Sequence, residues 1–119
     1  MKYKQLPIYK ISYDILVRIM QLVKHFSREY KYTLGEKIQK EAIELIICIY
    51  RANNKERRDL AIQDMLEHIQ LLGLFLRISH DLKLISMEHY AQIVEMIDNV
   101  SRQSQGWLNS INGKTPELV

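Results

Sequence analysis

The sequence predicts an all-α fold, an up-down-up-down bundle of four helices in a single domain spanning residues 1–119. Three observations lead to this prediction. Apolar residues recur with a period near 3.6 in four long segments. Short polar connections separate these segments, and short connections favour antiparallel neighbours. The chain holds 4 glycines and 2 prolines, too few for the many turns of an all-β fold.

The first helix is expected at about residues 7–26. Pro7 suits the first helical position, because the backbone N–H that proline lacks would have no partner there. The apolar stripe that follows consists of Ile8, Ile11, Ile15, Ile19, Leu22, Val23 and Phe26. A polar connection, residues 27–32, separates this helix from the next one.

The second helix is expected at residues 34–53, since Thr33 and Glu36 have the spacing of a capping box. Its core stripe comprises Leu34, Ile38, Ala42, Leu45 and Ile49. The third helix is expected at residues 56–79, with a stripe of Ile62, Met65, Ile69, Leu72 and Leu76. Gly73 lies inside this third helix, where a missing side chain favours close helix packing.

The fourth helix is expected at residues 87–112. Ser86 can cap it, and Glu88 in the first turn suits the positive end of the helix dipole. One apolar face comprises Tyr90, Ile93, Val94, Ile97, Val100, Leu108 and Ile111. Residues 113–119 are expected to form a frayed tail.

Composition limits the class of protein. Hydrophobic residues make up 47% of the 119 residues and charged residues 26%, which is ordinary for a globular chain. The single cysteine, Cys48, excludes an internal disulfide and a multi-cysteine metal site, and its apolar neighbours predict a buried side chain. The longest apolar run, residues 45–50, is too short to span a membrane, and charges interrupt the region where a secretory signal would lie. We therefore expect a cytoplasmic protein.

The chain lacks the patterns that are typical of an enzyme. Di-iron bundles use Glu-x-x-His on paired helices, and no histidine of this chain has a glutamate at that spacing. There is no glycine-rich phosphate loop, and the carboxylates are spread along polar faces. His68 and His89 are expected on the surface. The sequence predicts no catalytic residue, no metal ligand and no cofactor.

Three of the four helices carry more apolar surface than one core needs. At about 100° per residue, a second stripe lies off the core-facing stripe on the first three helices. Large exposed apolar groups are unfavourable on a small monomer, so this second stripe predicts a subunit interface. Its residues are Tyr13, Val17, Ile43, Ile47, Tyr50, Leu71, Leu74, Phe75 and Ile78. The alternative is a splayed bundle in which they widen a single core.

Positive charge gathers at both ends of the expected bundle, although the net charge is only +3. One candidate nucleic-acid site, shared with the N-terminal lysines, comprises Arg51, Lys55, Arg57 and Arg58. The other comprises Lys24, Arg28, Lys31 and Lys37. Each cluster suits either phosphate contacts or solvated charge, and an oligomer would repeat it. Tyr30 and Tyr32 suit either base stacking or packing over the bundle end.

Several segments resemble a known family. They are residues 6–9 (Leu-Pro-Ile-Tyr), 32–38 (Tyr-Thr-Leu-Gly-Glu-Lys-Ile), 77–86 (Arg-Ile-Ser-His-Asp-Leu-Lys-Leu-Ile-Ser), Tyr90 and 106–108 (Gly-Trp-Leu). These segments are similar to the accessory variability determinant (Avd-like) proteins of bacterial diversity-generating retroelements, over about residues 6–111. The wider superfamily includes the four-helix-bundle proteins of 23S rRNA intervening sequences, which usually end the second helix with an Asn-Ile-Ala-Glu-Gly-like motif. Here residues 49–53 read Ile-Tyr-Arg-Ala-Asn, which favours the retroelement branch.

The resemblance implies a four-helix protomer of a barrel-shaped, ring-like homopentamer with a basic surface. It also implies partners: the element's reverse transcriptase, and RNA or an RNA/DNA hybrid. In this picture the accessory protein is not catalytic and supports mutagenic cDNA synthesis by the reverse transcriptase. The alternative function is a protein-interaction module of the intervening-sequence type with no reverse-transcriptase role.

Overall fold

Four long helices account for most of the described chain, which covers residues 2–54 and 56–113 of the computed structural model. They are α1 (Pro7–Val23), α3 (Leu34–Asn53), α4 (Arg58–Asp81) and α5 (Met87–Ile111). A 3-10 turn, η1 (Tyr3–Gln5), precedes α1, and one helical turn, α2 (Arg28–Lys31), joins α1 to α3. The described residues contain no strand, so they bear out the predicted all-α class.

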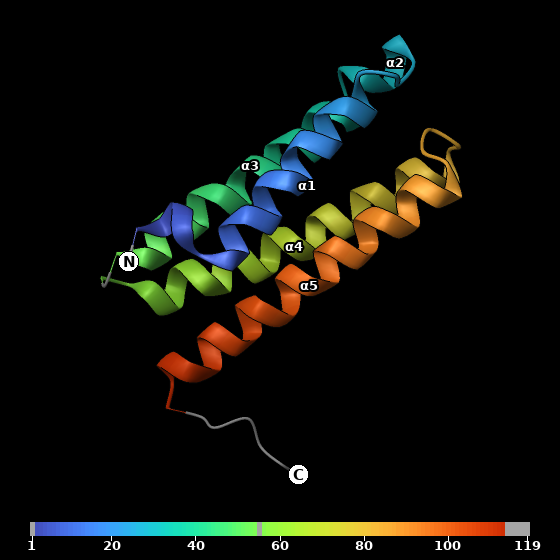
Figure 1. Ribbon diagram of the computed structural model, residues 1–119. Coiled ribbons are helices and arrows are strands. Elements are labelled where there is room, and N and C mark those ends of the chain that lie inside the picture. The colour runs from blue at the N-terminus through green and yellow to red at the C-terminus, as the bar shows by residue number, and fades with distance from the viewer. Residues whose placement is uncertain (1, 55, 114–119) are drawn as a thin grey trace.

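The four long helices run alternately up and down, and each packs on the helices next to it in the chain (Figure 1). The bundle closes because α1 also packs against α5. One end of the bundle holds η1 and the turn between α3 and α4, and the opposite end holds α2 and the connection between α4 and α5 (Figure 1). This arrangement fits the predicted up-down-up-down bundle and brings the two predicted basic clusters to opposite ends.

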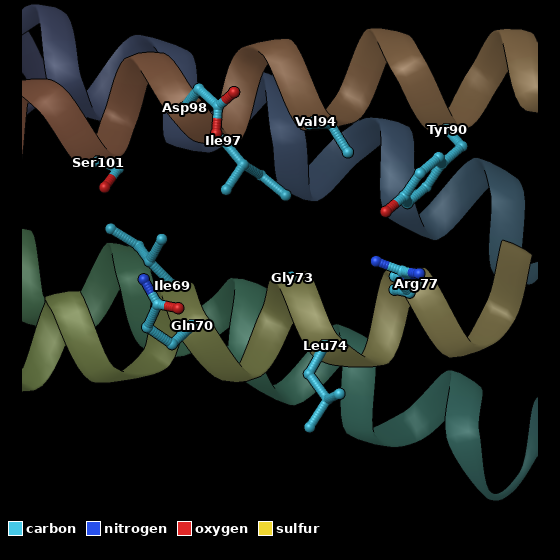
Figure 2. Close-up of a pocket in the computed structure, with 10 residues that line it drawn as sticks. All are labelled: Ile69, Gln70, Gly73, Leu74, Arg77, Tyr90, Val94, Ile97, Asp98 and Ser101. Atoms are coloured by element: carbon cyan, nitrogen blue, oxygen red, sulfur yellow. The ribbon is translucent and has the colours of Figure 1, made fainter.

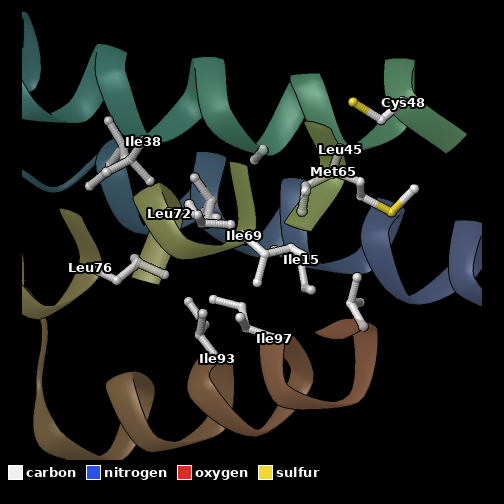
Figure 3. Packing of buried hydrophobic residues seen from close by; sticks show 14 of the residues in the cluster. Ile15, Ile38, Leu45, Cys48, Met65, Ile69, Leu72, Leu76, Ile93 and Ile97 are labelled. Carbon is white, nitrogen blue, oxygen red and sulfur yellow. The ribbon is translucent and has the colours of Figure 1, made fainter. Parts of the chain in front are cut away.

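The core is formed by the predicted stripes of all four helices (Figure 3). Fully buried side chains include Ile15 of α1, Leu45 of α3, Leu72 of α4 and Ile93 of α5. Each buried aliphatic side chain contributes about 1.5–3 kcal/mol relative to an exposed one. A smaller cluster at the η1 end joins Ala52, Ala61 and Ile62 to Trp107 and Leu108. The predicted periodicity therefore identified most of the core, but Ile111, which was predicted on the apolar face of the last helix, is 37% exposed.

The predicted bounds agree with the structure at α3 and nearly so at α5, where the Ser86 hydroxyl accepts from the His89 N–H at 3.1 Å as expected of a cap. Helix α4 begins and ends two residues later than predicted, at Arg58 and Asp81. Its start is delayed because Arg57 has a left-handed backbone, with φ at 55°. The predicted tail lies outside the described residues from residue 114 onward.

The first helix is shorter than predicted, because α1 ends at Val23 and not at Phe26. The chain turns after Val23, yet Phe26 is still buried in the core at 5% exposure. Gly35, in the first turn of α3, lies directly under this corner. A Cβ on Gly35 would be 2.7 Å from Val23 Cγ1 and 3.3 Å from the Tyr30 carbonyl oxygen. The close approach of α3 to the end of α1 therefore requires glycine at this position.

The predicted capping box at the start of α3 is wrong. Thr33 precedes the helix, but its side chain makes no cap hydrogen bond. Its hydroxyl instead donates to the Glu29 carbonyl at 2.9 Å, which closes the turn that follows α2. Residues 27–32 were predicted as a plain connection, but they contain the helical turn α2, which provides this competing acceptor.

The expectation that Gly73 allows close helix packing is also wrong. No atom lies within 4 Å of a Cβ placed on Gly73. Gly73 instead faces a cavity of about 370 Å³ between α4 and α5, where the side chains of Arg77 and Tyr90 point toward one another (Figure 2). Gly73 therefore leaves space open where the sequence suggested tight contact.

The two glycines give opposite predictions for substitution by alanine. Gly35→Ala forces the buried, β-branched Val23 to shift, and we expect a loss of about 1–3 kcal/mol in the free energy of unfolding. Gly73→Ala adds a methyl group in open space inside a helix, and we expect a gain of about 0.5–1 kcal/mol. Urea unfolding followed by circular dichroism, at equal protein concentration, measures both. Equal effects of the two substitutions would contradict the close approach at Gly35.

Candidate nucleic-acid and subunit interfaces

The first basic cluster lies at the turn between α3 and α4. Arg51 and Arg57 are exposed and border a hollow of about 540 Å³, together with Asn54 and Leu60. Lys55 lies outside the described residues. Glu56 and Asp64 also line this hollow and reduce its positive charge. The structure thus brings two of the four predicted side chains of this cluster to one open surface.

Arg58 has a different environment from its neighbours. Its Nε donates to the Ala52 carbonyl at 2.6 Å, and its Nη2 donates to the Asn53 carbonyl at 3.2 Å. The guanidinium carbon also lies 5.9 Å from the centre of the Trp107 ring. Carbonyls in the last turn of a helix lack helical partners, so Arg58 ties the end of α3 to the start of α4 and to α5. Sequence alone gave no signal that separates Arg58 from Arg57.

The second basic cluster lies around α2 at the opposite end of the bundle (Figure 1). Lys24, Arg28 and Lys37 are exposed, and Lys31 is half-buried. Lys83, exposed in the connection between α4 and α5, lies at this end too. The two predicted basic clusters therefore lie at opposite ends of the bundle.

The two tyrosines of the α2 segment have separate environments. Tyr30 is half-buried and packs against the hydrophobic core, whereas Tyr32 is 62% exposed. Of the two interpretations that the sequence left open, packing over the bundle end applies to Tyr30. The ring of Tyr32 is exposed to solvent beside the second basic cluster.

The second apolar stripe lies largely on the surface. Six of its nine residues are exposed: Tyr13, Val17, Ile43, Tyr50, Leu74 and Ile78. The other three, Ile47, Leu71 and Phe75, are half-buried. Phe75 packs against the core, so the alternative of a widened core applies to this side chain. The six exposed residues of the stripe are distributed over α1, α3 and α4.

His68 is not a surface residue as predicted. It is half-buried, and its Nδ1 lies 2.5 Å from Oε2 of Glu41, a residue of α3 that is only 9% exposed. A carboxylate oxygen accepts, so the histidine Nδ1–H donates. Glu44 also approaches, with Oε2 3.9 Å from His68 Nε2. This pairing offsets the cost of burying the Glu41 carboxylate between α3 and α4. The sequence does not reveal this contact, because Glu41 and His68 face one another only after α3 and α4 pack together.

Cys48 is buried at 1% exposure, as predicted. Burial, together with the nearby Asp64 and Glu44 carboxylates, raises the pKa of its thiol from 9.0 to about 11. The thiol is therefore protonated at neutral pH and is a poor nucleophile. Across residues 2–54 and 56–113, no group of three acidic, histidine or cysteine side chains has the arrangement of a metal site. Within the same residues, no helix combines the length and apolar character required to cross a membrane.

Comparison with known proteins identifies the family. No curated protein matches the sequence. A family profile described as bAvd-like matches residues 6–111, which include all four long helices and both connections at the bundle ends. The match spans nearly the whole chain and coincides with the segments that resemble Avd-like proteins. This chain therefore belongs to the bAvd-like family.

Proposed function

We propose that this chain is the accessory protein of a diversity-generating retroelement. It forms a ring-like homo-oligomer that binds the element's reverse transcriptase and RNA or an RNA/DNA hybrid, and so supports mutagenic cDNA synthesis. The observation that carries the proposal is membership of the bAvd-like family, an accessory and non-catalytic family, over residues 6–111. The protein works in the cytoplasm, where template RNA and reverse transcriptase are present together.

The exposed apolar stripe supports the oligomer. Subunit contacts are built from apolar side chains on a rigid surface with a polar rim, and Val17, Ile43 and Ile78 present such side chains from three different helices. A ring that covers the aliphatic residues of this stripe also repeats both basic ends once per subunit. Repetition multiplies weak phosphate contacts, which explains how a chain of net charge +3 holds nucleic acid.

Partner capture tests the proposal directly. The tagged full-length protein is incubated with a diversity-generating retroelement reverse transcriptase, with and without template RNA, and the retained proteins are separated by electrophoresis. We expect the reverse transcriptase to be retained. An oligomer that retains neither the enzyme nor RNA at low salt indicates the alternative, an interaction module of the intervening-sequence type.

Substitution of Arg51 and Arg57 together by glutamine is expected to weaken RNA binding about tenfold at low salt and to reduce its salt dependence, because phosphate contacts release counterions. Arg58 is left intact because it holds α3 to α4. Fluorescence anisotropy at several salt concentrations measures both quantities. The matched control is Arg102→Gln, an exposed arginine of α5 that does not line the hollow. An unchanged affinity in the double variant removes this end of the bundle from the phosphate-binding surface.

A further inference from the structure

Four tyrosine rings form a continuous row at the η1 end of the bundle. The Tyr50 ring of α3 lies edge-on to Tyr3 of η1, with ring centres 5.2 Å apart. Tyr3 in turn lies edge-on to Tyr9 of α1 at 5.4 Å. Tyr9 and Tyr13 are stacked at 6.1 Å. The short N-terminal turn therefore joins the aromatic residues of α1 and α3 into one surface.

The two rings at the ends of this row are exposed to solvent, whereas the two inner rings are half-buried. Tyr50 is 51% exposed and Tyr13 is 50% exposed. Tyr3 and Tyr9 are half-buried and pack against the hydrophobic core, which holds the row in place. Each end ring thus offers aromatic surface on a rigid support. Nucleic-acid bases stack on such rings with little regard to sequence, because every base has a π face.

One lysine contacts the row, and other positive residues are neighbours of its tyrosines in the chain. Lys4 Nζ lies 6.0 Å from the centre of the Tyr3 ring. Two further lysines are exposed: Lys2, which precedes η1, and Lys10 of α1. Arg51 follows Tyr50 in α3 and borders the hollow that Arg57 also lines. Aromatic rings beside lysines and arginines are the combination with which proteins hold unpaired nucleotides.

We propose that this tyrosine row is a binding site for single-stranded nucleic acid. Unpaired bases stack on Tyr13 and Tyr50, while the neighbouring phosphates contact Arg51 and the N-terminal lysines. Bases inside a duplex are stacked on one another and offer no free face, so the site selects unpaired strands. This inference rests on the nucleic-acid role in the proposed function and adds the class of ligand and the residues that hold it.

Tyr13 and Tyr50 also belong to the stripe predicted as the subunit interface, and their position separates the two roles. Both end rings lie in the row with Tyr3, at the basic end. The exposed aliphatic residues of the stripe lie farther from this end, with Val17 about 6 Å along α1 from Tyr13 and Ile43 about 10 Å along α3 from Tyr50. We assign the aliphatic residues to subunit contact and the tyrosines to bases.

The experiment uses the full-length protein and two labelled strands of about 12 nucleotides, oligo-dT and a fully abasic strand with the same phosphates. The variants are Tyr13→Ala with Tyr50→Ala, and Tyr13→Phe with Tyr50→Phe, which keeps the rings. The matched control is Met87→Ala, which removes an exposed apolar side chain at the opposite end of the bundle, where α5 begins. Anisotropy gives the affinities, and sedimentation gives the mass of each variant.

We expect the native protein to bind oligo-dT roughly five- to a hundred-fold more tightly than the abasic strand. The double alanine variant should lose this difference, while the phenylalanine variant and Met87→Ala should keep it. Equal binding of both strands by the native protein overturns the tyrosine site but leaves the proposed nucleic-acid role intact. A lower mass of the alanine variant overturns it too, since the rings then form the subunit contact. Base-dependent binding without capture of the reverse transcriptase removes the partner from the proposed function and supports the tyrosine site.

Discussion

Substitution of Ile43 and Ile78 together by lysine is expected to convert the assembled protein into a smaller species with the same helical content. Ile43 of α3 is 39% exposed and Ile78 of α4 is 37% exposed, so the folded protomer can place both ammonium groups in water. In the proposed assembly the same charges would be buried without partners, which costs several kcal/mol per charge. Sedimentation equilibrium measures the mass, and circular dichroism measures the helical content.

Met87→Lys is the matched control for that experiment. Met87 is also an exposed apolar residue, at 65%, but it begins α5 and lies outside the second stripe. Its substitution should leave the mass unchanged. Phe75 is not suitable for the same test, because it packs against the core and its loss would weaken the protomer itself. If the double variant sediments as the native protein does, the exposed stripe is not the subunit interface.

Much of the fold could be predicted because its signals are local. The stripe on α3 and the Asn53–Asn54 end fix that helix without reference to the rest of the chain, and its observed bounds are the predicted ones. The errors arise where distant segments meet. Phe26 continues the period of α1, yet the chain must turn at Val23 so that α3 can pass close by at Gly35. No periodicity within α1 contains that information.

The candidate sites were predictable only as groups of residues. Sequence places the basic side chains at the two ends, but it does not show which of them the fold itself uses. It also gives no contact between Tyr3 and Tyr50, which are far apart in the chain and meet only when η1 lies against α3. Glu41 and His68 pair for the same reason, across the contact between α3 and α4. The sequence therefore does not predict the side-chain contacts that form only when two helices pack together.

Arg58→Ala is expected to lower the free energy of unfolding by about 2–3 kcal/mol. The substitution removes two charge-assisted hydrogen bonds, to the Ala52 and Asn53 carbonyls, and the contact with the Trp107 ring. Arg58→Lys should recover little of this loss, because an ammonium group cannot reproduce the two directions of the guanidinium fork. Urea unfolding at equal protein concentration measures the change.

Arg57→Ala is the control, since Arg57 is exposed, precedes α4 and makes no side-chain cap bond. Its effect on stability should stay within about 0.5 kcal/mol. In RNA binding the order reverses: Arg57→Ala weakens affinity, and Arg58→Ala leaves it unchanged under conditions where the variant is fully folded. Equal unfolding midpoints for the two variants would show that the Arg58 contacts give no net stabilisation.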